Sequence, residues 1–323
     1  MNRLEIDARA APEVSVVIPI YNEEAGLAAL FARLYPALDA LGRTYELVLV
    51  DDGSRDRSPA LLHEQFDRRP DVTRVVYLLT NFGQHMAILA GFERSRGQVV
   101  VTLDADLQNP PEEIARLLEK MEEGHDYVGS YRSQRRDSAF RRVASRAVNR
   151  LRESLTRVRM SDHGCMLRAY RRSVVDTINQ SRELNTFVPA LAYLYARRPT
   201  EIEVRHEPRA AGASQYSLSR LLRLNFDLIT AFSVRPLHIF SIIGMAVALG
   251  SLVLYLGVLL YQLYDAGFPG ALAHAWDRDI LEFFLMGLAL FGIGLTGQYI
   301  VRIHEQVKGR PRYLVAAVLE KRE

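Results

Sequence analysis

The sequence predicts an α/β fold, with a Rossmann-like, mostly parallel sheet in the first domain and a two-helix transmembrane anchor after it. Three observations support this prediction. Apolar β-branched runs alternate with helical patterns, polar clusters follow four successive runs, and two long stretches late in the chain carry no charge. Strands that alternate with helices are typical of a parallel sheet covered by helices on both faces.

Length and composition exclude several other classes of protein. The chain has 323 residues, of which 49% are hydrophobic and 24% charged, so it suits one large or two smaller globular domains. Disordered, collagen-like and coiled-coil proteins have different compositions. The single cysteine, Cys165, allows no internal disulfide, and no Cys/His group has the spacing of zinc ligands.

The expected elements follow one another along the first part of the chain. The first run, VSVVIPI, is continuously apolar, as in a strand that is buried on both faces. The expected strands are Val14–Ile20, Tyr45–Val50, Val72–Leu79, Gln98–Leu103 and Tyr127–Tyr131. The expected helices are Glu24–Leu41, Ser58–Arg68, Gln84–Arg94 and one that opens at Pro110, with proline and acidic residues in its first turn.

Polar clusters stand where four of these strands end. They are Tyr21–Glu24, Asp51–Asp52, Asn81–His85 and Asp104–Asp106. In open parallel sheets, ligands bind beyond the carboxyl ends of the strands. We therefore expect the functional site at this edge.

The cluster after the fourth strand predicts a metal site. Asp104, Asp106 and Gln108 offer oxygen ligands at every second position, and Mg²⁺ and Mn²⁺ bind such ligands together with substrate phosphates. An isolated Asp-x-Asp is common in acidic loops. Its place directly after a strand, with the Asp51–Asp52 pair nearby, favours the metal interpretation.

Two uncharged stretches predict a membrane anchor. Ile239–Leu263 has 25 residues and Phe283–Val301 has 19. A hydrocarbon core of about 30 Å needs roughly 20 helical residues, so each stretch is long enough to cross. Two buried core helices are the alternative. The polar N-terminus does not resemble a signal peptide.

Flanking charges predict the orientation of the anchor. Arginines and a lysine flank the two spans, whereas the loop between them is acidic, so both termini are expected in the cytoplasm. The expected divisions are a cytosolic domain (1–215), an amphipathic juxtamembrane helix (216–236), two transmembrane helices (237–302) with a short periplasmic loop (264–282), and a cytosolic tail (303–323). For 216–236, a helix packed on the cytosolic domain is the alternative.

Three motifs, in this order and spacing, resemble those of family 2 glycosyltransferases with the GT-A fold. They are Val16–Glu24, Val50–Asp56 and Leu103–Glu112. The two late spans extend the resemblance to the branch that uses polyprenyl phosphates, which includes dolichol-phosphate mannose synthases. Closer similarity, to enzymes that transfer 4-deoxy-4-formamido-L-arabinose to undecaprenyl phosphate, rests on Asn81–Gly91, Asp162–Arg172 and Arg310–Tyr313.

The resemblance implies roles for individual residues. The donor nucleotide would be held by Pro19, Tyr21, Glu23, Asp52, Gly83, Gln84 and Asp104. A divalent ion, Mg²⁺ or Mn²⁺, would be bound by Asp104, Asp106 and Gln108. The catalytic residues would be Asp106 and Asp162, of which Asp162 stands where the acceptor is activated. The acceptor phosphate would meet Arg132, Arg146, Arg209, Ser214 and Tyr216.

Each role has a structural alternative. Asp52 suits a turn before glycine, Asp162 suits a helix cap or turn, and Arg132 and Arg146 lie in an arginine-rich stretch typical of a solvated surface. His85 and His163 are candidates for acid–base groups, but a supporting or structural role is favoured for both. Near the end of the first domain, Ala213 and Gln215 depart from the relatives' usual Gly-Glu-Ser-Lys-Tyr pattern, which leaves the donor sugar open.

The expected function is inverting transfer of 4-deoxy-4-formamido-L-arabinose from UDP to undecaprenyl phosphate, in lipid A modification and resistance to polymyxin and other cationic antimicrobial peptides. Transfer of glucose or another hexose is the first alternative. A membrane-anchored nucleotide-binding module without turnover is the second. The resemblance also implies a bacterial inner-membrane protein and a homo-oligomer, by analogy a tetramer, and no nucleic-acid partner is expected.

Overall fold

The computed structural model describes residues 11–132, 160–162, 164–181, 187–207, 275–309 and 311–321, together with positions 237, 240, 242–244, 246–247 and 250. The chain divides into two compact units. The first contains residues 1–153, 157–216 and 311–323, and the second contains 154–156 and 217–310.

The first unit is built on one mixed sheet. Its strands, among the described residues, are β1 (Val14–Ile20), β2 (Tyr45–Asp51), β3 (Thr73–Leu78), β4 (Val99–Thr102), β5 (Tyr127–Arg132), β6 (Arg168–Arg171), β7 (Pro199–Val204) and β8 (Val315–Leu319). They lie in the order β7-β5-β6-β4-β1-β2-β3-β8. The pairs β1–β2, β1–β4, β2–β3 and β5–β7 are parallel, whereas β4–β6, β5–β6 and β3–β8 are antiparallel. The predicted α/β sheet is confirmed, with antiparallel strands added to its parallel centre.

Helices connect the strands, and most begin where the sequence predicts. They are α1 (Leu27–Asp39), α2 (Ser58–Arg68), α3 (Gln84–Arg94), the 3₁₀ turn η1 (Pro111–Glu113), α4 (Ile114–Glu122), α6 (Arg172–Gln180) and α7 (Val188–Tyr195). The start of α1 was predicted three residues too early. The backbone N–H of Glu24 donates to the Asp56 carboxylate (3.1 Å) and its side chain accepts from the N–H of Arg57 (2.9 Å), so Glu24 belongs to the loop.

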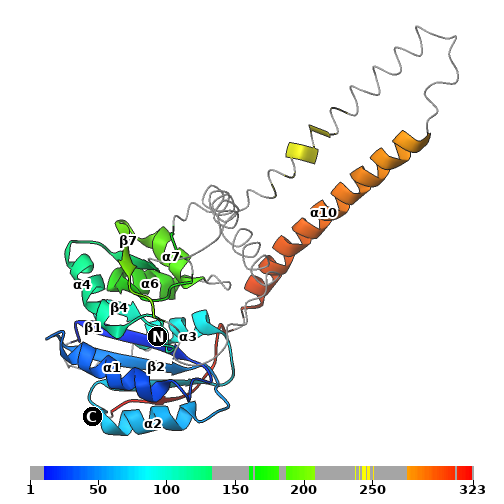
Figure 1. Ribbon diagram of the computed structural model, residues 1–323. Helices are drawn as coiled ribbons and strands as arrows, with labels where there is room; N and C mark the ends of the chain where they lie inside the picture. The colour runs from blue at the N-terminus through cyan, green and yellow to red at the C-terminus, as the bar shows by residue number, and fades with distance from the viewer. Residues whose placement is uncertain are drawn as a thin grey trace, which may run out of the picture. The chain divides into compact units, whose positions relative to one another are not determined.

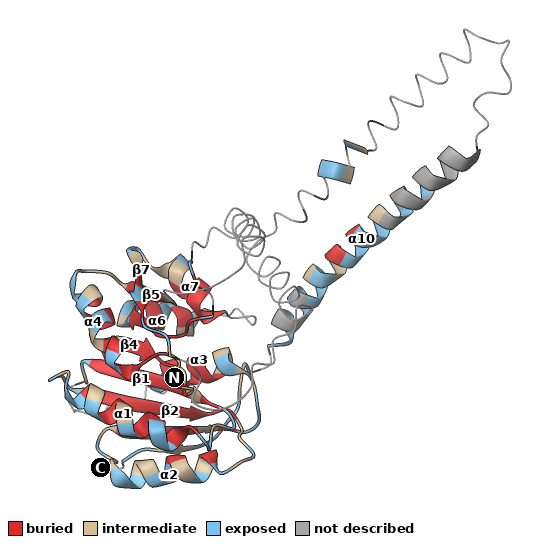
Figure 2. Ribbon diagram, in the orientation of Figure 1, coloured by how far each residue is buried: buried red, intermediate tan, exposed pale blue. Residues whose placement is uncertain are grey.

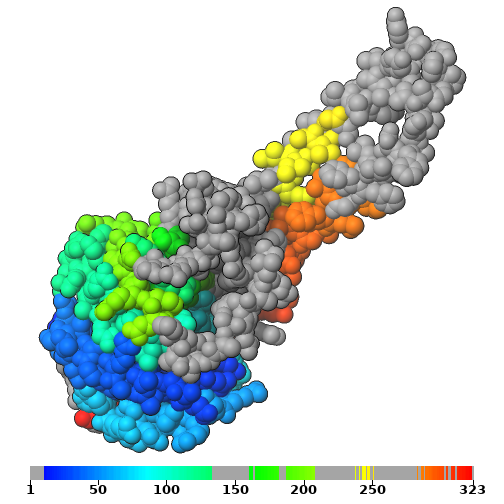
Figure 3. Space-filling model, viewed as in Figure 1, coloured from blue at the N-terminus to red at the C-terminus, as the bar shows by residue number. Residues whose placement is uncertain are grey.

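The sheet is the middle of three layers (Figure 1). On one face, side chains of α1, α2 and α4 form a single apolar cluster with alternate residues of the strands, among them Val16, Leu49 and Val101. On the other face α3 packs on β1 and β2, and α6 and α7 pack against each other and against α3. Figure 2 shows β1, β2 and β4 buried between helices whose outer faces are exposed. In Figure 3 the atoms of residues 11–132 and 187–207 join into one continuous body.

The end of the chain contributes an edge strand to the first unit. The prediction treated 303–323 as a tail, but β8 pairs with β3, and Leu79 donates its N–H to the Leu314 carbonyl (2.8 Å). Glu320 forms an ion pair with Arg74 (3.1 Å) on the neighbouring strand. The apolar sequence VAAVL is too short to stand out from the sequence alone, and its partner strand lies far away in the chain.

The second unit contains the long helix α10 (Ala275–Lys308). It begins within the predicted loop 264–282, and the Phe240 ring lies 5.8 Å from the Phe291 ring of the helix. In the portion of the chain that the structure describes, no helix combines the length and apolarity needed for a membrane crossing. The predicted juxtamembrane helix (216–236) and most of the first predicted span lie outside the described residues.

Close contact between α3 and the sheet depends on Gly91. A Cβ at this position would collide with the Val17 side chain and lie 3.2 Å from a methyl group of Val50. We therefore expect Gly91→Ala to lower the free energy of unfolding by about 1–3 kcal/mol through overpacking. In an exposed helix the same change would stabilise by about 1 kcal/mol. Urea unfolding of both proteins tests this, and a variant more stable than the parent would contradict the packing described here.

Candidate functional site

The candidate site lies at the carboxyl ends of β1, β2 and β4. The parallel register pairs Ile20 with Asp51 and Val17 with Thr102, so these three strands end at the same edge. Beyond the strands, the main chain continues in register, since Asp52 donates its N–H to the Ile20 carbonyl (2.8 Å) and Leu103 to that of Val17 (3.1 Å). The predicted polar clusters are therefore brought together.

The loops after β1 and β2 hold each other in place. The N–H of Asn22 donates to Ser54 Oγ (3.0 Å), and Asn22 Oδ1 accepts the N–H of Arg55 (2.8 Å). Asn22 has a left-handed backbone (φ 54°), which asparagine tolerates better than most residues. The N–H of Glu23 donates to Ser58 Oγ at the start of α2 (3.0 Å). Tyr21, which is 44% exposed, follows β1 directly at this edge.

Asp52 is buried and organises the loop that precedes α3. Its two carboxylate oxygens accept the backbone N–H groups of Phe82 (2.7 Å) and Gly83 (2.9 Å). Burial raises the pKa of Asp52, and these two hydrogen bonds oppose the rise. Asp52, predicted to bind the donor nucleotide, here holds the Gly83 loop, whose left-handed glycine (φ 95°) precedes α3.

The Asp-Gly turn after β2 requires glycine for two reasons. Gly53 has a left-handed backbone (φ 69°). A Cβ there would also approach the Thr80 carbonyl carbon to 2.5 Å, so the two loops could not lie this close with any other residue. Local propensity alone explains the Asp52-Gly53 turn from the sequence. In the structure the glycine also lets the loop after β2 pack closely against the loop after β3.

Asp104 and Asp106 form the acidic centre of the site. Gln84 Nε2 donates to Asp104 Oδ1 (2.6 Å), and the N–H of Gln108 donates to Asp106 Oδ1 (3.1 Å). Burial and the neighbouring Asp106 raise the pKa of Asp104 to about 7, and the bond from Gln84 opposes the rise. Leu107, between Asp106 and Gln108, is held in a left-handed conformation (φ 58°) that is unusual for a leucine.

This acidic centre fits a divalent cation. Without a counter-ion, two neighbouring carboxylates resist ionising together, and a cation removes that repulsion. Among the described residues, no group of three or more His, Cys, Asp or Glu side chains is arranged as a complete metal site. Mg²⁺ and Mn²⁺ are commonly held by one or two carboxylates and complete their coordination with water and phosphate oxygens. The two carboxylates of Asp104 and Asp106 match this number of protein ligands, and Gln108 follows them in the same loop.

The loop carrying these residues is tied to the chain after β7. Glu207 donates its N–H to the Gln108 carbonyl (2.9 Å). Arg33, on α1, bonds both Glu207 (2.8 Å) and Glu112 (3.0 Å). Sequence analysis did not select Arg33, because its two partners are far away in the chain.

Asp162 and Arg132 form a two-point ion pair. Arg132 Nε and Nη2 donate to the Asp162 carboxylate at 2.6 and 3.1 Å, and the N–H of Gly164 donates to the same carboxylate at 2.9 Å. Asp162 is buried and Arg132 half-buried, and the bond to Asp162 raises the pKa of Arg132. The structure therefore joins the predicted acceptor-activating carboxylate to a predicted phosphate-binding arginine.

Two further groups adjoin the site. Arg168, at the start of β6, is fully buried and was not selected from the sequence; its one signal was a charge inside the apolar run CMLRAY. The His85 ring packs edge-on against Phe187 at 5.0 Å, and its Nδ1 is buried without a hydrogen-bond partner among the described residues. Burial lowers the pKa of His85 to about 4, so the ring is neutral at pH 7.

Some predicted residues are not tested. Arg146, His163, Arg209, Ser214 and Tyr216 lie outside the described residues. Pro19 lies near the end of β1, and Glu23 lies in the loop that follows it.

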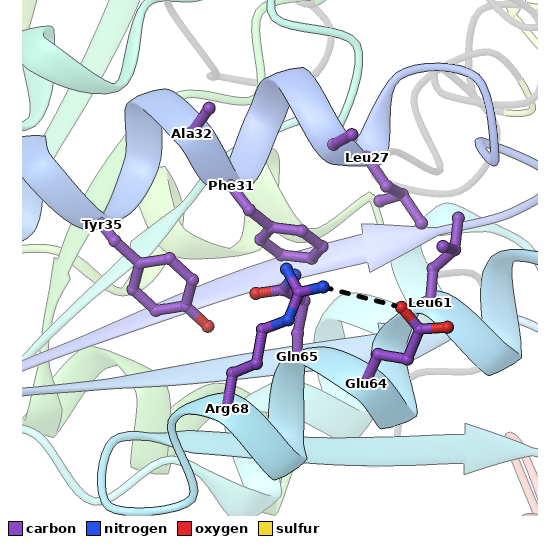
Figure 4. Close-up of a pocket in the computed structure, with 9 residues that line it drawn as sticks. Leu27, Phe31, Ala32, Tyr35, Leu61, Glu64, Gln65 and Arg68 are labelled. Atoms are coloured by element: carbon purple, nitrogen blue, oxygen red, sulfur yellow. Dashed lines mark ion pairs between the residues drawn. The ribbon is translucent and has the colours of Figure 1, made fainter.

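A hollow of about 350 Å³ between α1 and α2 is separate from this constellation (Figure 4). Phe31 and Tyr35 line it from α1, and Leu61 lines it from α2. Its marked ion pair joins Arg68 to Glu64 at 3.9 Å. None of the predicted site residues lines it, so it is no part of the candidate site.

Comparison with known proteins identifies the family. Glycosyl transferase family 2 matches residues 15–178, which is half of the chain. A relative from Pseudomonas paraeruginosa, named undecaprenyl-phosphate 4-deoxy-4-formamido-L-arabinose transferase, is 49% identical over 95% of this chain and 90% of its own length. A relative of the same name from Edwardsiella ictaluri is 45% identical over 97% of this chain and 96% of its own.

Solved structures also resemble the chain. Glucosyl-3-phosphoglycerate synthase from Mycobacterium tuberculosis, solved with Mn²⁺, UDP and phosphoglyceric acid, has a TM-score of 0.48 and 19% identity, over 68% of this chain and 77% of that one. From the family match and the near full-length relatives, the chain belongs to glycosyl transferase family 2, alongside the undecaprenyl-phosphate 4-deoxy-4-formamido-L-arabinose transferases, and it is a glycosyltransferase.

Proposed function

We propose that the protein transfers 4-deoxy-4-formamido-L-arabinose from a UDP donor to undecaprenyl phosphate, with inversion at the anomeric carbon and release of UDP. The observation that carries the proposal is the alignment of relatives bearing this name with at least 95% of the chain. The acidic centre and the Asp162–Arg132 pair support it. Transfer of a sugar from a nucleotide to a phosphate requires groups that bind the diphosphate of the donor, through a cation, and groups that bind the phosphate of the acceptor.

In the proposed reaction, a phosphate oxygen of the acceptor forms a bond to the anomeric carbon as the bond to the donor diphosphate breaks. The electron pair of that bond leaves with UDP. A divalent cation held by Asp104, Asp106 and Gln108 would stabilise the negative charge that grows on the diphosphate. Gln84 fixes one of these carboxylates through its 2.6 Å bond to Asp104.

Asp162 is assigned to orientation more than to proton removal. The acceptor phosphate is already anionic near neutral pH, so it needs little activation. Arg132 binds Asp162 through two N–H groups, and a guanidinium has five such donors. The pair can therefore meet an incoming phosphate as one preassembled unit. Arg146, Arg209, Ser214 and Tyr216 are proposed to complete this acceptor site.

The setting of the reaction is part of the proposal. We assign the protein to the bacterial inner membrane, with spans within 237–302, an interfacial helix at 216–236, both termini in the cytoplasm and a homo-oligomeric, tetrameric assembly. The uncharged stretches and the arginines beside them support this assignment. The product would serve lipid A modification and resistance to cationic antimicrobial peptides.

A donor panel tests the proposed reaction. Purified full-length protein is incubated with undecaprenyl phosphate, Mn²⁺ and UDP-linked sugars, and the glycolipids are identified by mass. We expect transfer from the formamido-arabinose donor. Transfer from UDP-glucose alone would refute the sugar assignment in favour of a hexosyltransferase, the alternative left open by the departures at Ala213 and Gln215. UDP binding without transfer from any donor would instead indicate a nucleotide-binding module.

Replacement of Asp104 tests the acidic centre. We expect Asp104→Asn to reduce kcat by about 100-fold or more, because it removes one carboxylate that binds the cation and fixes the diphosphate. Asp39→Asn, an exposed carboxylate bonded to Tyr45 on the outer side of α1, is the matched control and should retain activity. Equal activity of the parent and the Asp104 variant would remove Asp104 from the mechanism.

The thermal stability of Asp104→Asn should differ from that of the parent in a pH-dependent way when a chelator keeps the site free of cations. The pKa of Asp104 is raised in the folded state, to about 7, so ionisation of its carboxyl opposes folding. The folded protein holds this proton more tightly, so stability falls as pH rises from about 4 to about 7. Asp104→Asn should therefore melt at a higher temperature than the parent at pH 8, with the difference shrinking towards pH 4. A lower melting temperature at pH 8 would contradict this.

Gly164→Ala tests the ion pair without changing a charge. A Cβ at Gly164 would lie 3.0 Å from Arg132 Nη2 and 3.5 Å from Asp162 Oδ1, so the pair must shift. We expect kcat to fall by about 10- to 100-fold, because small misplacements at a reacting centre are costly. Gly42→Ala, in a left-handed turn away from the pair with no atom within 4 Å of the added Cβ, controls for a general loss of stability. Equal kcat values for the two variants would show that the pair's geometry is irrelevant.

A further inference from the structure

We propose that Arg168 is a positioning residue of the transfer reaction, which holds the turn carrying Asp162 and supplies the buried positive charge beneath the carboxylates of the site. This inference rests on the proposed function and extends it to a residue on the floor of the site. Contacts, space and charge support it separately.

The contacts of Arg168 close the turn around its guanidinium. Nη2 donates to the main-chain carbonyl of Asp162 (2.6 Å) and Nε donates to that of Cys165 (2.7 Å). Nη1 donates to the hydroxyl of Tyr127 on β5. The planar guanidinium of Arg168 thereby fixes the main-chain carbonyls of residues 162 and 165 relative to each other. This holds the turn in place, so the Asp162 side chain keeps its direction towards Arg132.

The fold makes room for this guanidinium. A Cβ at Gly129 would lie 3.2 Å from Arg168 Nη1, closer than most side-chain carbons come, so β5 has a glycine beside the charge. In the sheet register Arg168 pairs with Thr102, the last residue of β4, and Asp104 follows two residues later. The buried charge therefore lies at the edge where the acidic loop begins.

The charge of Arg168 is not matched by its immediate neighbours. Within the described part of the chain, no carboxylate lies within 4.0 Å of the guanidinium, and its three hydrogen-bond acceptors are neutral, although the side chain is fully buried. Burial of a charge without a close counter-ion is costly. Two sources can offset this charge: the acidic loop that begins two residues after Thr102, the register partner of Arg168, and Glu201, whose Oε1 would lie 3.4 Å from the same Cβ at Gly129.

A purely structural role predicts different behaviour. An arginine needed only to join strands would affect stability, as Arg172 should. Arg172 is also poorly exposed and donates to a main-chain carbonyl, that of Gly97 (2.8 Å), but it follows the other end of β6. It is a matched control, with the same side chain and a similar type of bond, away from the site.

The test compares Arg168→Met, Arg168→Lys and Arg172→Met in the full-length protein. Measurements are kcat and KM for each substrate, binding of UDP with Mn²⁺, and melting temperature. We expect Arg168→Met to lower kcat about 100-fold with KM for the donor changed less than about 3-fold, because the turn is misplaced while the donor loops remain. Lysine should restore part of kcat, since it keeps the charge but loses the fork. Arg172→Met should lower the melting temperature with kcat within about 2-fold of the parent.

Each outcome decides between the interpretations. If Arg168→Met keeps the kcat of the parent, or if lysine is no better than methionine, the positioning role is wrong. If Arg168→Met does not fold, Arg168→Lys and Gly129→Ala carry the test, and unchanged kcat in both would overturn the proposal. Absence of transfer by the parent protein would refute the proposed function and this inference together, whereas transfer by the parent with full turnover of the variants refutes only the inference.

Discussion

The parallel pairing of β1 with β2 and β4 is the constraint on which the site depends. It makes three strands end at one edge, and the loops beyond that edge carry peptide N–H groups that have no partner in the sheet. Such groups must be satisfied, and side chains of adjacent loops do this: Asn22 bonds the loop after β2, and Asp52 bonds the loop after β3. The polar residues that define the motifs are thus also the residues that hold the loops together.

The antiparallel strands add what a purely parallel sheet would lack. Because β6 runs opposite to β4, its first residue, Arg168, lies at the edge where β4 ends. The last residue of β5, Arg132, reaches Asp162, which precedes β6 by a few residues. Two arginines therefore stand beside an acidic loop, and reversal of strand direction explains how positive charge enters a site whose first three motifs are largely acidic.

The sequence was informative where the pattern was local and uninformative where it was not. The bounds of β1, α2 and α3 were predicted correctly because an apolar run, a proline at the helix start and turn residues mark them. The pairing of Arg132 with Asp162 joins residues 30 positions apart and depends on the β5–β6 order. Arg168 required knowledge of burial, and β8 required knowledge of a distant partner strand, so neither was accessible from local pattern.

The site has an acidic half, formed by Asp104 and Asp106, and a basic half, formed by Arg132 with its partner Asp162. The two halves differ in how their charges are balanced. The acidic half resists full ionisation, since burial and Asp106 raise the pKa of Asp104. The basic half keeps Arg132 occupied by Asp162. The acidic half thus resists full ionisation on its own and would be stabilised by a cation, whereas in the basic half the charge of Arg132 is already matched by Asp162.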